Sequence, residues 1–179
     1  MGGKYKGALP YGGTTFIGRL IEELKSDTQR LWLSYGEQLQ GEYEGCRIIR
    51  DEYLDCGPMG GLQAGLKHCE SELLLVAACD MPLLKMELYQ YLFSFLGEHG
   101  GVVPVCEGRI HPLAALYKKK LLPIFESYLQ NGNYRLRAAL EESDIYYVDV
   151  TDYPDFRRML QNINTEEDYA ALLRAQECV

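Results

Sequence analysis

An uninterrupted apolar run constrains the fold of this chain more than any other feature. Residues 73–79, Leu-Leu-Leu-Val-Ala-Ala-Cys, place no polar side chain on either face of an extended segment. A short apolar run that ends at a turn is typical of a strand buried on both faces inside a parallel sheet. Asp80-Met81-Pro82 follows directly, and Pro82 ends strand pairing because it has no N–H to donate. The run therefore predicts a layered α/β protein with Asp80 at the carboxyl end of a central strand.

Strands alternate with helices along the rest of the chain, as in α/β folds with a mostly parallel sheet. A length of 179 residues favours one domain, residues 1–179. Thr14 or Thr15 can cap the first helix, and Thr165 with Asp168 forms a capping box before the last one. The expected strands are 30–34, 46–49, 73–79, 102–105 (disturbed by Pro104), 110–117 and 145–150, and the expected helices are 16–24, 60–69, 85–96, 119–129, 134–142 and one from 165.

Composition excludes several classes of protein. The chain is 47% apolar and 25% charged, which is ordinary globular composition, and its net charge is −8. An acidic surface repels the phosphate backbone, so we expect no general nucleic-acid binding. No apolar run reaches the roughly 18 residues of a membrane helix, and the N-terminal stretch has no apolar core of a signal peptide. The six cysteines form no Cys-x-x-Cys pair, and we expect reduced thiols in a cytoplasmic protein.

Asp80 is the strongest candidate for a functional residue. Ligands of open α/β sheets bind beyond the carboxyl ends of the strands, where Asp80 is expected. A lone carboxylate there suits Mg²⁺, which takes one or two protein carboxylates and fills its other positions with phosphate oxygens and water. The alternative is an aspartate that only caps the helix that follows.

Glycines gather at a second strand-to-helix junction, residues 51–62. Gly57, Gly60 and Gly61 let backbone N–H groups approach a ligand at the positive end of a helix dipole. Asp51 and Asp55 can accept hydrogen bonds from a nucleobase or ribose. The alternative is a glycine turn that only permits tight packing of the helix on the sheet.

Two further segments offer polar groups. Lys6 lies in a glycine-rich N-terminal stretch and can meet phosphate oxygens, although the spacing is not that of a P-loop and a solvated terminus is the alternative. In Asn162-Ile-Asn164-Thr165, Asn164 can brace the helix cap while Asn162 can face a ligand. The histidines show no spacing for a Ser/His/Asp triad or for a zinc pair.

The order of these segments resembles one known family. It is similar from end to end to the molybdenum cofactor guanylyltransferases of the MobA type. The matching segments are Lys6-x-x-Leu-Pro10, Asp51-(x)₅-Gly57-Pro-Met-Gly-Gly61-Leu62, Asp80-Met-Pro82, His111-Pro-Leu-Ala-Ala-Leu-Tyr117, Gly132-Asn-x-Arg135 and Asn162-Ile-Asn-Thr165.

The resemblance implies a three-layer, Rossmann-like nucleotidyltransferase domain. It implies that Lys6 and Asp51 or Asp55 bind GTP together with Gly57 and Gly61, that Asp80 binds Mg²⁺ and nucleotide, and that Lys6 and Asp80 are catalytic. Arg135, Asn162 and Asn164 match regions that hold the molybdopterin substrate.

The sequence also departs from the family pattern. The family begins with a strand and a glycine-rich phosphate loop, and Met1-Gly2-Gly3 resembles the tail of that loop. We therefore expect the first strand to be missing, two strand edges to be unpaired, and stability and activity to be reduced. An exposed edge makes a homodimer or a partner from cofactor biosynthesis plausible. Gly36 stands where the family usually has Asn, which affects one expected contact with the base or ribose.

The implied reaction is attack by a molybdopterin phosphate oxygen on the α-phosphorus of GTP, with release of pyrophosphate. No protein nucleophile is needed for it, so positioning and charge neutralisation by Mg²⁺ at Asp80 and by Lys6 are the expected contributions. The alternatives are a related transferase that uses CTP or a sugar-phosphate acceptor, and a non-catalytic relic that binds nucleotide or pterin.

Overall fold

The computed structural model describes residues 6–35 and 43–177 of the chain. In chain order it contains the 3₁₀ helix η1 (Lys6–Ala8), β1 (Pro10–Tyr11), β2 (Thr14–Thr15), α1 (Phe16–Leu24), β3 (Trp32–Tyr35), β4 (Arg47–Arg50), α2 (Pro58–His68), β5 (Leu73–Ala77), α3 (Met86–Phe93), β6 (Gly101–Cys106), β7 (Arg109–Ile110), β8 (Ala114–Lys118), the 3₁₀ helix η2 (Lys119–Leu121), α4 (Leu122–Gln130), α5 (Leu136–Glu141), β9 (Ile145–Asp149), α6 (Pro154–Met159) and α7 (Glu166–Glu177). No helix among these residues is long and apolar enough to cross a membrane.

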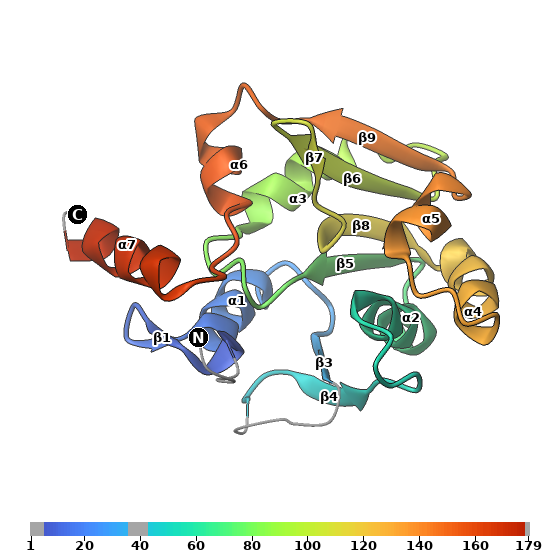
Figure 1. Cartoon of the computed structure of the whole chain (residues 1–179), viewed down its shortest axis with the longest axis horizontal. Helices are drawn as coiled ribbons and strands as arrows, with labels where there is room; N and C mark the ends of the chain where they lie inside the picture. The colour runs from blue at the N-terminus through green and yellow to red at the C-terminus, as the bar shows by residue number, and fades with distance from the viewer. Residues whose placement is uncertain (1–5, 36–42, 178–179) are drawn as a thin grey trace.

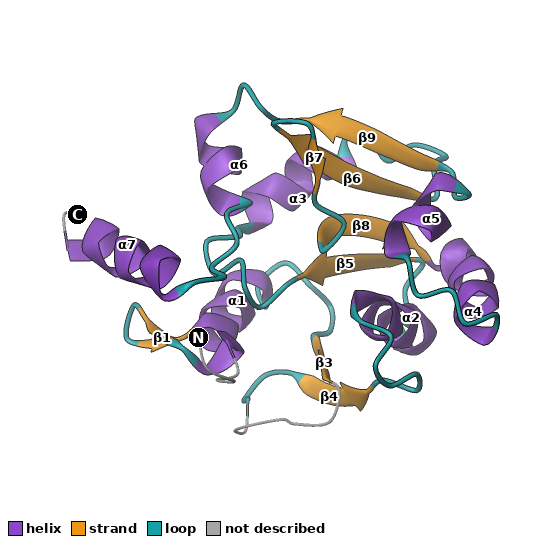
Figure 2. Cartoon of the chain, viewed as in Figure 1, coloured by secondary structure: helices purple, strands orange, loops and turns teal. Residues whose placement is uncertain are grey.

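A five-stranded sheet forms the centre of the molecule (Figures 1 and 2). Its strand order is β5-β8-β6-β7, and β9 pairs with β6. β8 runs antiparallel to both β5 and β6, whereas β9 is parallel to β6. Strands β5, β6 and β9 therefore run in one direction, and β7 and β8 run in the opposite direction. Most strands of the sheet thus share one direction, as the sequence predicts. Pro104 lies in β6 between the residues that pair with β8 and those that pair with β7. Its missing N–H is therefore at the point where β6 changes from pairing with β8 to pairing with β7.

β3 and β4 form a separate parallel pair. α2 lies between this pair and helices α4 and α5, which pack on the main sheet (Figure 1). α2 connects β4 to β5 and packs against β3, β4 and β5. In the described part of the chain, β5 pairs only with β8 and β3 pairs only with β4. Both strands thus keep one unpaired edge, as the sequence led us to expect.

Helices cover both faces of the main sheet, which gives the predicted three layers (Figure 2). One buried cluster joins α1, α3 and α6 to one face, and a second joins α2, α4 and α5 to the other. Alternate side chains of β5 pack into one cluster or the other, because successive residues of a strand face opposite sides of the sheet. Leu73 and Leu75 pack against the first cluster, and Leu74 and Val76 pack against the second.

β5 differs from its prediction in one respect. The apolar run predicts a strand buried on both faces in the centre of a sheet, yet all five residues of β5 are only half buried. The most deeply buried strands are instead β6 and β8, in which Val102, Val103 and Tyr117 have no exposed surface. The physical reason is that β5 has one unpaired edge, so no neighbouring strand covers its side chains on that side.

The remaining elements follow the sequence with small shifts. The Thr15 hydroxyl accepts a hydrogen bond from the Gly18 N–H at the start of α1, as predicted. The expected strand 110–117 is divided into β7 and β8 around Pro112. The hairpin of β1 and β2 and the short helix α6 have no counterpart among the predicted elements.

The core assignment can be tested at α2. Leu66 is completely buried in the cluster with α4 and β8, whereas Leu54 in the preceding loop is 52% exposed. Leu66→Ala should lower the free energy of unfolding by about 2–5 kcal/mol, because it removes buried methyl groups and leaves a cavity. The matched Leu54→Ala should change it by less than about 0.5 kcal/mol in urea unfolding. Equal effects of the two substitutions would contradict this packing.

Candidate active site

Asp80 lies just beyond the carboxyl end of β5, where the sequence predicts it. The Ala78 N–H donates to the Leu113 carbonyl at 2.8 Å, so pairing with the β8 side continues almost to Asp80. The Asp80 backbone carbonyl accepts from the Ile163 N–H at 2.8 Å, and its Oδ2 accepts from the Asn162 Nδ2 at 3.2 Å. The segment before α7 therefore fixes both the backbone and the carboxylate of Asp80.

Lys6 and Asn164 bring the N-terminal segment to the same place. The Lys6 Nζ donates to the Asn164 Oδ1 at 2.6 Å, although the two residues are 158 positions apart. Asp168 holds the segment from the other side, since its Oδ2 accepts from the N–H groups of Asn164 and Thr165. These hydrogen bonds, those from Thr165 first, lower the pKa of Asp168. The Asp168 N–H in turn donates to the Thr165 hydroxyl, which confirms the predicted capping box.

The sequence indicated neither of these pairings. Asn162 and Asn164 were expected to meet the molybdopterin substrate, and the structure places their side chains on Asp80 and Lys6. Their contact with a substrate stays a prediction. Only the motif Asn-Ile-Asn-Thr itself could have indicated that this segment belongs to the site. Hydrogen bonds between residues so far apart in sequence leave no local pattern.

Cys79 is a second residue of this cluster that the sequence did not single out. Burial raises the pKa of the Cys79 thiol, and the neighbouring Asp80 carboxylate raises it further. The Lys6 ammonium acts in the opposite direction. Burial therefore favours the neutral form of this thiol.

Asp51 lies at the facing side of the site, at the end of β4. Its carboxylate accepts a hydrogen bond from the Ser34 hydroxyl of β3. Gly60 and Gly61 of α2 approach this pair closely: a Cβ on Gly60 would lie 2.6 Å from the Tyr53 carbonyl oxygen, and one on Gly61 would lie 3.2 Å from the Ser34 Oγ. Glycine at these two positions therefore permits tight packing, as the structural alternative predicted, and also leaves the carboxylate accessible.

Asp55 is placed differently from Asp51. It is exposed and has a φ of +57°, a left-handed conformation that Asp tolerates better than most residues. It lies in the turn before Gly57, which itself has φ +59° and ψ −146°. α2 begins at Pro58 without a side-chain cap, so its first N–H groups are available to a ligand.

One cavity of about 1160 Å³ joins these parts of the site. Of the predicted site residues, it is lined by Lys6, Asp51, Gly57, Gly61 and Asp80, together with Ser34. Asp55, Arg135, Asn162 and Asn164 do not line it. Arg135 is exposed at the start of α5, and the adjacent Tyr134 lies beside Cys56 of the 51–57 loop, whose thiol raises the pKa of the Tyr134 hydroxyl. Gly2, Gly3 and Gly36 lie outside the described residues.

The residues around Asp80 suit a weakly held divalent cation. Among the described residues, no three or more His, Cys, Asp and Glu side chains gather as a metal cage. Mg²⁺ does not require such a cage, because it commonly keeps several waters and binds one or two carboxylates plus substrate phosphates. A half-buried carboxylate oriented by Asn162 is compatible with that mode of binding.

Comparison with known proteins identifies the family. The sequence model described as "MobA-like NTP transferase domain" matches residues 1–146. The chain belongs to this family. It is 32% identical to a probable molybdenum cofactor guanylyltransferase of Methanosarcina mazei, over 94% of this chain and 82% of the relative, and 30% identical to one of Flavobacterium johnsoniae, over 91% and 85%.

Solved structures agree on the fold of this MobA-like chain. The molybdopterin-guanine dinucleotide biosynthesis protein A of Archaeoglobus fulgidus superposes with a TM-score of 0.82 at 23% identity, covering 99% of this chain and 93% of that one. The 2-C-methyl-D-erythritol 4-phosphate cytidylyltransferase of Thermus thermophilus superposes with a TM-score of 0.72 at 15% identity, covering 97% and 94%. The predicted nucleotidyltransferase fold is thereby confirmed.

The backbone of the 51–57 loop gives a test of the site geometry. Gly57→Ala should lower the free energy of unfolding by about 1–3 kcal/mol, because its φ and ψ lie in a region open almost only to glycine. Asp55→Gly should change it by no more than about 1 kcal/mol, since glycine adopts φ +57° freely. Urea unfolding of both variants measures the difference, and a tolerated Gly57→Ala would argue against this loop conformation.

Proposed function

We propose that this MobA-like chain transfers GMP from GTP to molybdopterin, releasing pyrophosphate and forming molybdopterin guanine dinucleotide. The observation that carries the proposal is the meeting of Lys6, Asp80 and the Asn162–Asn164 segment at the carboxyl end of β5. An ammonium and a carboxylate there give a phosphate-transfer site both a cation and a metal ligand. The names of the relatives supply the substrates.

The residues contribute by positioning and charge. The Asp80 carboxylate would hold Mg²⁺, whose positive charge would offset the negative charge of the nucleotide phosphates. Lys6 adds a second positive charge at the same phosphates, and the Asn164 side chain accepts a hydrogen bond from its ammonium. Asn162 fixes the direction of the Asp80 carboxylate. No side chain forms a covalent intermediate, because the acceptor phosphate oxygen itself attacks the α-phosphorus.

The facing side of the cavity is proposed to bind the nucleoside. Asp51 is the better placed of the two candidate aspartates, since it lines the cavity and Asp55 does not. A carboxylate is an acceptor, and guanine offers N–H donors while ribose offers hydroxyl donors. The N–H groups at the start of α2, after Gly57, are proposed to meet phosphate oxygens. Arg135 stays the proposed contact for the molybdopterin side.

We further propose that residues 1–179 act as one domain in the cytoplasm. Residues after 146, beyond the family match, contact the N-terminal part of the chain. The Ile163 N–H donates to the Asp80 carbonyl, and Tyr169 packs edge-on against Phe16. The five described cysteines are free thiols, a state that a reducing compartment maintains.

The nucleotide specificity can be measured directly. With molybdopterin as acceptor and Mg²⁺ present, GTP should support turnover and pyrophosphate release, and CTP should be slower by a factor of about 100 or more. The physical reason is that a polar group left unpaired by the wrong base costs several kcal/mol. Turnover with CTP and none with GTP would reassign the protein to a cytidylyl transferase.

The roles of Asp80 and Asn162 are separable by their dependence on Mg²⁺. Asp80→Asn should lower kcat/KM by about 100-fold or more, and added Mg²⁺ should not restore it. Asn162→Ala should weaken apparent Mg²⁺ affinity by about 10–100-fold, and high Mg²⁺ should largely restore the rate, because only the orientation of the ligand is lost. Asp152→Asn, an exposed aspartate after β9, is the matched control and should have no effect. Recovery of Asp80→Asn at high Mg²⁺ would show that Asp80 is not the metal ligand.

A further inference from the structure

The segment between β5 and α3 carries Asp80, and its backbone is held by side chains and backbone from elsewhere in the chain. Residues 81–84, directly after Asp80, are all buried. Buried backbone carbonyls need hydrogen-bond partners, because water does not reach them. The Asp80 carbonyl accepts from the Ile163 N–H at 2.8 Å, and the Pro82 carbonyl accepts from a side chain of α1. The position of this segment therefore depends on α1.

Two charged side chains of α1 hold the segment at two places. The Arg19 Nε donates to the Pro82 carbonyl at 3.1 Å. The Glu23 Oε1 accepts from the Met86 N–H at 3.2 Å, at the start of α3, where Lys85 supplies no side-chain cap. A carboxylate at this position is also favoured by the dipole of α3. Residues four apart lie on one side of a helix, so Arg19 and Glu23 form one row that faces the segment.

Arg19 also contacts the N-terminal segment of the chain. Its guanidinium carbon lies 5.2 Å from the centre of the Tyr11 ring, which is a cation–π contact. Tyr11 is buried in a third hydrophobic cluster, which also contains Leu83. Arg19 therefore joins the N-terminal segment, which carries Lys6, to the segment that carries Asp80.

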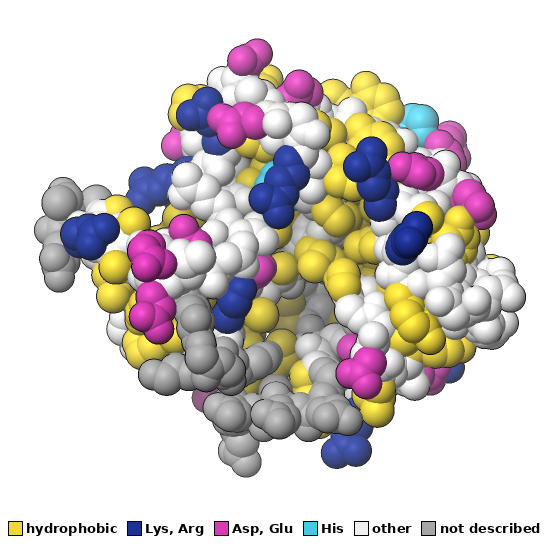
Figure 3. Space-filling view, in the orientation of Figure 1, with side chains coloured by type: hydrophobic (Ala, Val, Ile, Leu, Met, Phe, Trp, Pro, Cys, Tyr) yellow, Lys and Arg dark blue, Asp and Glu magenta, His cyan; other side chains and the backbone are white. Residues whose placement is uncertain are grey.

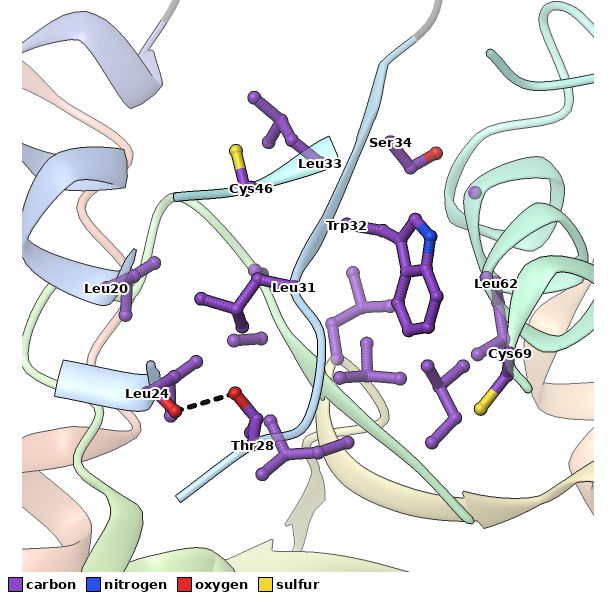
Figure 4. A pocket seen from close by; sticks show the side chains of 18 of the residues that line it. Leu20, Leu24, Thr28, Leu31, Trp32, Leu33, Ser34, Cys46, Leu62 and Cys69 are labelled. Atoms are coloured by element: carbon purple, nitrogen blue, oxygen red, sulfur yellow. Dashed lines mark hydrogen bonds between the residues drawn. The ribbon is translucent and has the colours of Figure 1, made fainter. Parts of the chain in front are cut away.

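α1 is itself held by apolar packing. Figure 4 shows Leu20 and Leu24 on the cavity side of α1, and both are buried in the cluster that joins α1 to α3. The Thr28 hydroxyl donates to the Leu24 carbonyl at 2.8 Å at the end of the helix. Within the described part of the chain, neither Arg19 nor Glu23 takes part in an ion pair. Both charges thus act on the backbone of the segment after β5.

The surroundings of Asp80 make the position of each charged group important. The cavity beside it is lined mainly by apolar residues of α1, β3 and β5. Figure 3 shows hydrophobic side chains around the hollow at the centre of this face. Apolar walls lower the local dielectric constant, so charge interactions are stronger there and change more with distance than in open water.

We propose that Arg19 and Glu23 are positioning residues for Asp80. By holding the segment after β5, they fix where the Asp80 carboxylate lies relative to the Lys6 ammonium. Neither side chain lines the cavity, so both act through the segment and not on a substrate. The inference rests on the proposed function, because it concerns the cation that Asp80 is proposed to bind.

The probe is Mn²⁺ together with a non-hydrolysable GTP analogue, and free Mn²⁺ is measured by electron paramagnetic resonance. Arg19→Met removes the donor and the charge but keeps an unbranched side chain. It should weaken Mn²⁺ binding by about tenfold or more, as loss of a group that orients a metal ligand commonly does. Arg19→Lys keeps a cation that can donate to the Pro82 carbonyl and lie over Tyr11, and it should retain most of the affinity.

Glu23 is tested in the same way with two controls. Glu23→Ala should also weaken Mn²⁺ binding, whereas Glu23→Gln keeps an oxygen that accepts from the Met86 N–H and should have a smaller effect. Glu22→Ala, at an exposed position of α1, should have no effect. Leu66→Ala lowers stability from the other face of the sheet and should leave Mn²⁺ affinity unchanged, which separates loss of position from loss of stability.

Unchanged Mn²⁺ affinity in both Arg19→Met and Glu23→Ala would overturn the inference. An equal loss of affinity in Leu66→Ala would also overturn it, because stability alone would then explain the effect. If the unaltered chain binds Mn²⁺ but transfers no GMP, the proposed function fails while these affinities remain measurable, so the two failures are distinguishable. An unaltered chain that binds no Mn²⁺ would overturn both.

Discussion

The pairing of β5 with β8 is the interaction on which the fold and the site both depend. Five residue pairs, from Leu73 with Lys118 to Ala77 with Ala114, attach β5 to the main sheet. This pairing places alternate β5 side chains in the two hydrophobic clusters and brings Asp80 to the carboxyl end of the strands. A slip of one residue would exchange the two faces of β5 and displace Asp80 from Asn162.

The same strand connects the stability of the protein to its chemistry. Its second edge is unpaired in the described structure, and the long cavity beside it runs without interruption into the polar site. The Asn162 side chain donates to the Asp80 carboxylate, and the Lys6 ammonium donates to Asn164. Ala78 and Cys79, which line the same cavity, connect β5 to Asp80.

The sequence predicts the elements whose signals are local. The apolar run before Asp80 and Pro82 locates β5 and its polar end correctly, and the threonine caps locate α1 and α7. It does not predict that β8 is inserted between β5 and β6, because strand order depends on packing between residues about 40 positions apart. It also leaves Asp51 and Asp55 equivalent, whereas in the structure Asp51 lines the cavity and Asp55 does not. The contacts of Asn162 and Asn164 likewise depend on tertiary structure alone.

The central claim is that Asp80 is the metal ligand of a nucleotide site formed at the end of β5. A crystal structure with a non-hydrolysable GTP analogue and Mn²⁺ in place of Mg²⁺ tests it most directly, because the anomalous signal of manganese locates the cation without assumptions. We expect one anomalous peak within coordination distance of an Asp80 carboxylate oxygen, with nucleotide phosphate oxygens beside it that also contact Lys6. A nucleotide bound elsewhere, or a cation held without Asp80, would contradict it.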